Sequence, residues 1–192
     1  DISESEIVSL KKELAEAVDA SSSTRMRRAY KSVVRDGEKL LKSSPTAPNR
    51  YRVLNIVFQS QKRLLAMDNS KENRDALLET CVKLAGAPDE VADLRLEADL
   101  LLSERALSSR NADVKERAEV LQKLIARYRD TPGEAKSLMM ASQIAPKLEA
   151  FELEIRILRA MQERFADHHG VIEFRRKSLA AGRIEALFRG TF

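Results

Sequence analysis

The sequence predicts an all-α protein built from antiparallel helix pairs, and three observations support this fold class. Ala, Leu, Glu, Lys and Arg, which favour helices, dominate the composition. Apolar residues recur with the 3.6-residue period of a helix in one segment after another, and the β-branched runs that strands favour are missing. With 43% hydrophobic and 33% charged residues among 192, the chain is too apolar to be disordered and long enough to bury a core.

Capping signals divide the first half of the chain into four predicted helices. Ser3 followed by Glu6 forms a capping box for the first helix, and a serine within 21–23 caps the second. Two closely spaced prolines end the second helix. The third helix is expected over about 49–67, and the polar segment 68–70 ends it and caps the fourth.

Five further helices are predicted in the second half. Pro88 takes the first position of the fifth helix, Asn111 caps the sixth, and Thr131 caps the seventh. Pro146 ends the seventh helix or starts the eighth, and the ninth is expected over about 171–187. The chain therefore contains about nine helices joined by short connections, which is the pattern of antiparallel neighbours.

The expected organisation is an N-terminal helical hairpin over 1–44, followed by an array of helix pairs over 45–192 that continues it. An internal repeat supports the array, because 121–133 and 158–170 place Leu, Arg, an aromatic residue, Asp and Gly at the same spacing. One helix pair cannot cover its own apolar face, and stacking the next pair covers it. Such a unit therefore recurs along the chain.

This repeat resembles tetratricopeptide (TPR)-like helical repeats over roughly residues 50 to 187. Its period of about 37 to 44 residues exceeds the usual 34, and the usual early Trp is absent. The resemblance implies pairs stacked as a right-handed array, and a protein-binding or spacer role. Tyr128 and Phe165, which end their helices, are expected to wedge between neighbouring pairs. An irregular helical bundle with chance matches is the alternative.

The C-terminal segment 180–192 resembles the helix that leads into a thioredoxin- or redoxin-like domain in exported bacterial proteins. The resemblance implies a thiol-disulfide oxidoreductase-like domain beyond this chain, because Cys81, the one cysteine, does not supply a Cys-x-x-Cys motif. Since the chain begins at Asp1 rather than Met, we expect a processed chain from which an export signal could have been removed. An exported, periplasmic location is the first expectation, and a cytoplasmic location is the alternative.

Basic side chains are the candidate interaction residues of this mildly basic chain, whose net charge is +4. The candidates are Arg25, Arg28, Lys31, Arg35, Arg175 and Arg176. The basic face Arg25-Arg35 could neutralise phosphates, which makes a nucleic-acid-binding helical protein the alternative function. We instead expect a solvated helix face beside the acidic first helix, because neither a recognition motif nor interleaved aromatic residues accompany the charges.

The sequence predicts no catalytic, cofactor-binding or metal-binding residue. Phosphate-binding loops, nucleophile elbows and zinc-binding motifs are all missing from it. His168 and His169 are the only histidines and lack the further ligands that zinc needs. Cys81 lies in an apolar stripe, as a buried core residue does. An enzyme with an unrecognised helical active site is a second rival interpretation.

We therefore expect a non-catalytic helical-repeat region for protein interaction or scaffolding, without a cofactor. The expected partner is a protein, a peptide or an adjoining domain of the same protein, and nucleic acid is the less favoured partner. No apolar run approaches the roughly 20 residues that a membrane-spanning helix needs. A flat or concave face made by the first helices of successive pairs would present side chains to the partner.

Overall fold

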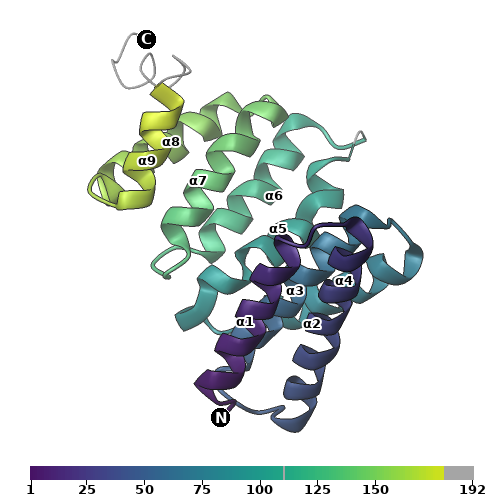
Figure 1. The fold of residues 1–192 in the computed structure, drawn as a ribbon. Coiled ribbons are helices and arrows are strands. Elements are labelled where there is room, and N and C mark those ends of the chain that lie inside the picture. The colour runs from purple at the N-terminus through teal and green to yellow at the C-terminus, as the bar shows by residue number, and fades with distance from the viewer. Residues whose placement is uncertain (110, 180–192) are drawn as a thin grey trace. The chain divides into compact units, whose positions relative to one another are not determined.

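The computed structural model describes residues 1–109 and 111–179, and across these ranges the chain is helical and contains no strand (Figure 1). The all-α fold class is therefore confirmed. Contacts divide the chain into two compact units, Asp1–Leu102 and Ser103–Phe192. Within the first unit, the first two helices pack on the third.

The first unit is a set of consecutive helices that pack side by side (Figure 1). Their short connections make neighbouring helices antiparallel. The helices are α1 (Glu4–Val18), α2 (Ser23–Ser43), α3 (Arg50–Met67) and α4 (Lys71–Ala85). A short 3-10 turn over Asp89–Val91 precedes α5 (Ala92–Leu107), which belongs to this unit as far as Leu102.

Helix α3 is the centre of this unit because it is apolar on two sides. One side packs in a cluster with α1 and α2, and its buried residues are Ile2, Ile7, Leu10, Val33, Ala47, Val53 and Ile56. The other side packs in a cluster with α4 and α5, and its buried residues are Leu54, Phe58, Leu77, Cys81, Leu84 and Ala98. Burying each large apolar side chain contributes about 1.5–3 kcal/mol, so α3 is fixed between its neighbours.

The predicted caps of the first, second and fourth helices agree with the structure. The Ser3 side chain accepts from the backbone N–H of Glu6, and Glu6 accepts from the backbone N–H of Ser3 at 3.0 Å, which is the predicted capping box. Ser22 caps α2, and Ser70 caps α4 by accepting from the N–H of the residue three positions later. These caps are local, so the sequence was sufficient to locate them.

Three predicted helix starts in the second half are wrong. Asp113, not Asn111, caps α6, because only Asp113 has Glu116 three residues later to complete a capping box. The Thr131 hydroxyl donates to the carbonyl of Tyr128 at 2.7 Å and closes a turn, so α7 begins later, after Gly133. Pro88 precedes the 3-10 turn rather than opening a helix.

The second unit places α7 at its centre, where α7 packs against α6, α8 and α9 (Figure 1). The bounds are α6 (Val114–Arg127), α7 (Glu134–Ile144), a 3-10 turn over Ala145–Leu148, α8 (Phe151–Phe165) and α9 (His169–Leu179). Tyr128, the C-cap of α6, is fully buried, and Phe165, which ends α8, is half-buried. Arg164 of α8 donates to Asp130 at 2.6 Å and to buried Glu134 at 2.9 Å.

Some predictions from the sequence concern residues or features that the described parts of these units do not show. The predicted end of the ninth helix and the segment 180–192, which carried the thioredoxin-like resemblance, lie outside the described residues. Right-handed stacking of TPR-like pairs stays a prediction. Within residues 1–109 and 111–179, no helix combines the length and the apolar character that crossing a membrane requires.

Candidate functional site

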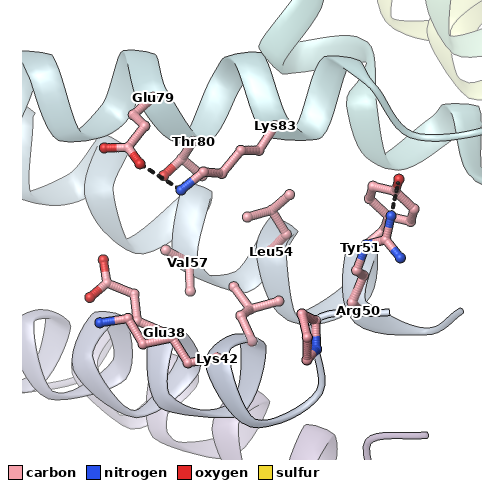
Figure 2. Close-up of a pocket in the computed structure, with 11 residues that line it drawn as sticks. Glu38, Lys42, Arg50, Tyr51, Leu54, Val57, Glu79, Thr80 and Lys83 are labelled. Atoms are coloured by element: carbon pink, nitrogen blue, oxygen red, sulfur yellow. Dashed lines mark hydrogen bonds and ion pairs between the residues drawn. The ribbon is translucent and has the colours of Figure 1, made fainter. Parts of the chain in front are cut away.

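A cavity in the first unit lies over α3, between α2 and α4. It has a volume of about 730 Å³. Figure 2 shows Leu54 and Val57 of α3 between charged side chains that come from α2 on one side and α4 on the other. Leu54 and Val57 are buried in the core below, so the floor of the cavity is rigid and apolar.

Charged side chains form the two rims of this cavity. On α4, Lys83 donates to Glu79 at 2.6 Å, and this hydrogen bond lowers the pKa of the Glu79 carboxyl (Figure 2). On α2, Glu38 and Lys42 face the same space (Figure 2). The cavity therefore presents an apolar floor between two polar walls, an arrangement that suits an amphipathic ligand.

An aromatic residue closes one end of the cavity. Arg50 donates to the Tyr51 hydroxyl at 2.8 Å, and its guanidinium lies 4.6 Å from the centre of the Tyr51 ring. The Tyr51 hydroxyl donates to the carbonyl of Gly86 at 3.4 Å, which joins the start of α3 to the end of α4. This end of the cavity is thus held by contacts between two helices.

A second cavity, of about 230 Å³, adjoins the first one at Glu38 and follows the same three helices. Arg27, Lys31 and Arg35 of α2 line it on one side, and the first turns of α4 line it on the other. Leu64 of α3 lies at its floor. We call the two adjoining cavities together the α2–α4 groove.

The basic candidate residues of α2 divide into those that line the groove and those that do not. Lys31 and Arg35 line the groove, whereas Arg25 and Arg28 do not line it, and Arg25 donates to Ser21 at 3.2 Å. Arg35 donates to Asp36, and this hydrogen bond raises the pKa of its guanidinium. Arg35 is therefore paired within α2, and Lys31 and Arg35 are the candidates that belong to the groove.

Arg27, which the sequence analysis did not single out as a candidate, also lines the groove. It forms an ion pair with Asp68, which follows α3. The candidates Arg175 and Arg176 lie on α9 in the second unit, where Arg176 pairs with Glu173 at 3.2 Å. The six candidate residues thus do not form one site within either unit.

Gln61 of α3 is a groove residue that the sequence analysis did not single out. It is only 5% exposed, lines the second cavity, and its Oε1 accepts no hydrogen bond from any described residue. Buried amides are nearly always hydrogen-bonded, so this oxygen requires an explanation. A polar residue inside an apolar stripe was the signal that could have identified it.

The cysteine and the two histidines do not line the groove. Burial raises the pKa of the Cys81 thiol to about 11, so this cysteine is an inert part of the core. His168 and His169 are exposed, and the His168 ring contacts the edge of Phe165 with 6.0 Å between ring centres. No group of three or more metal-ligating side chains occurs in the part of the chain that the structure describes.

Comparisons with protein-family models, with curated proteins and with solved structures found no match to this chain.

Proposed function

We propose that this chain is a non-catalytic protein-interaction module, and that the α2–α4 groove of its first unit binds an acidic peptide segment of a partner protein. The observation that carries the proposal is the groove itself. Its main cavity, about 730 Å³, lies within the range of about 300–1,000 Å³ that is usual for ligand sites. It combines an apolar floor with charged rims, as peptide-binding grooves do.

The charges of the groove favour a negatively charged segment. Arg27 pairs with Asp68, Lys83 pairs with Glu79, and Arg35 pairs with Asp36. Among the described residues, the lining side chains that then have no ion-pair partner are Lys31, Lys42, Arg50, Glu38 and Glu72. The positive charges exceed the negative ones, and they lie near both ends of the groove.

The apolar floor supplies the second part of the recognition. Leu54 and Val57 face the cavity from α3, and Leu41 contributes from α2. Covering apolar surface contributes about 25 cal/mol for each Å² removed from water, so one apolar side chain of the partner would provide much of the affinity. The charged rims would then set specificity and the rate of association.

Selection from a library of random displayed peptides tests this proposal. Purified chain should enrich peptides that combine Asp or Glu with an apolar residue. Lys42→Glu should weaken an enriched peptide about tenfold or more, because a carboxylate replaces the attracting cation. Lys39→Glu is the matched control: Lys39 is exposed on the same helix but does not line the groove, so affinity should change little.

Two results would overturn the proposal. One is that no enriched peptide distinguishes Lys42→Glu from Lys39→Glu. The other is tight binding of random-sequence DNA or RNA with a steep dependence on salt and with loss on substitution of Lys31 and Arg35, because such binding would identify a nucleic-acid-binding protein. Peptide affinity should also fall with added salt, but less steeply, because the floor contacts are apolar.

A further inference from the structure

The buried amide of Gln61 indicates how a peptide would lie in the groove. The inference below rests on the proposed function and makes it more specific. Gln61 lines the second cavity with Lys31 on one side and Asn73 on the other. Its Oε1 has no donor among the described residues, and leaving a buried acceptor unsatisfied is unfavourable compared with pairing it. A ligand that supplies an N–H to this oxygen would remove that penalty.

We infer that Gln61 binds the main chain of the partner peptide, and that the peptide lies in the groove in an extended conformation. A primary amide both donates and accepts hydrogen bonds, as a peptide group does, so one Gln side chain can pair with one peptide unit. The last side-chain torsion of Gln has broad minima. Either the amide oxygen or the amide nitrogen of Gln61 can therefore turn toward the cavity.

An extended peptide fits this requirement and an α-helical one does not. In a helix, the backbone N–H groups beyond the first four are bonded within the helix, and few remain for Gln61. In an extended segment every backbone N–H is available. The unpaired Oε1 of Gln61 therefore favours a strand-like ligand over a docked amphipathic helix.

The spacing of the groove cations sets the length of the segment. Lys31 and Lys42 belong to one helix, α2, and at 1.5 Å per residue their positions are about 16 Å apart along its axis. An extended peptide advances about 3.3 Å per residue, so about five residues cover that span. The expected ligand carries acidic side chains about five residues apart, with an apolar residue between them over Leu54 and Val57.

The main-chain contact is tested with a peptide enriched by the library selection and with its analogues N-methylated at one amide each. Gln61→Met keeps the side-chain length and removes the amide. We expect Gln61→Met to weaken the peptide by about two- to tenfold, the effect of one hydrogen bond. One N-methyl analogue should lose a similar factor on the wild-type chain and lose little more on Gln61→Met.

Gln59→Met is the matched control, because Gln59 lies on the same helix outside the groove and donates instead to Glu97 at 3.1 Å. It should leave peptide affinity unchanged. Thermal unfolding verifies that Gln61→Met is folded, and its midpoint should not fall, because the substitution removes an unpaired polar atom.

The outcomes separate this inference from the function on which it rests. If peptides bind through Lys42 but Gln61→Met retains full affinity, the main-chain contact is wrong and the groove function stands. A helical bound conformation in transferred nuclear Overhauser spectra would overturn the extended conformation in the same way. If no groove-dependent peptide is enriched, the proposed function fails, and the inference fails with it.

Discussion

Gly37 determines how closely α2 approaches the floor of the groove. A Cβ at this position would lie 2.5 Å from Cγ2 of Val57 and 3.3 Å from Cδ2 of Leu10. Val57 is buried in α3 and its branched side chain is stiff, so the helices would have to separate. We predict that Gly37→Ala lowers the free energy of unfolding by about 1–2 kcal/mol, because overpacking outweighs the helix propensity of Ala.

Urea unfolding followed by circular dichroism measures this change, and Gly86→Ala is its matched control. Gly86 is exposed at the end of α4 with φ −80°, and a Cβ there would meet only backbone atoms at 3.4 Å or more. Gly86→Ala should leave stability unchanged or raise it slightly. Equal stabilities of Gly37→Ala and the wild type would contradict the close approach of α2 to α3.

Cys81 should be unreactive in the folded protein. Burial raises the pKa of its thiol from 9.0 to about 11, which lowers the thiolate fraction at pH 8 by about a hundredfold. Alkylation by iodoacetamide should therefore be slow in native buffer and fast in concentrated urea, as measured by mass spectrometry. Rapid alkylation without urea would show that Cys81 is accessible and is not a core residue.

The raised pKa of the Cys81 thiol also determines the direction in which stability changes with pH. The folded state holds the thiol proton more tightly than the unfolded state does. The contribution of this thiol to stability is therefore complete below pH about 9 and is lost as the pH rises toward 11. In the neutral range the thiol is protonated in both states, so its own contribution to stability does not change with pH.

At the scale of the element, helix caps that involve only neighbouring residues could be predicted from the sequence. A helix start that depends on the conformation of the preceding turn could not. Ser3, Ser22 and Ser70 each cap a helix through an N–H three residues away, so a short stretch of sequence contains the whole interaction. Thr131 looked like a cap as well, but its hydroxyl bonds back to Tyr128. The conformation of that turn, with Asp130 at φ 62°, depends on the fold around it.

The capping box of α1 leads to a prediction about acid stability. Hydrogen bonds from the Ser3 side chain and backbone lower the pKa of the Glu6 carboxyl. The carboxylate therefore contributes to stability above its ordinary pKa of 4.5, and the contribution is lost as the pH falls through the lowered value. Ser3→Ala should cost about 1 kcal/mol at pH 7 and clearly less at pH 3.

Chemical unfolding at the two pH values measures this difference. Ser9→Ala is the control, because Ser9 is exposed within α1 and its hydroxyl makes only a 3.5 Å contact with Glu13. Its substitution should have a small effect at both pH values. A loss for Ser3→Ala that is as large at pH 3 as at pH 7 would contradict the role of the Glu6 carboxylate.

At the scale of the whole molecule, the fold class could be predicted and the groove could not. The helical period can be recognised within each segment of the sequence. The groove, in contrast, is lined by residues of three helices, such as Glu38, Val57 and Thr80. Which faces of α2 and α4 border α3 depends on packing between segments distant in sequence. The basic cluster of α2 was visible in the sequence, but its division between Asp68, Asp36 and the groove was not.

Backbone amide spectra of the ¹⁵N-labelled chain, titrated with a library-selected acidic peptide, test most directly whether the α2–α4 groove is a binding surface. We predict saturable shifts at groove residues of α2, α3 and α4, including Lys31, Gln61 and Thr80. Exposed Val8 of α1, which does not line the groove, should stay unshifted. Saturable shifts confined to α1 or to the second unit, with the groove unchanged, would contradict the account.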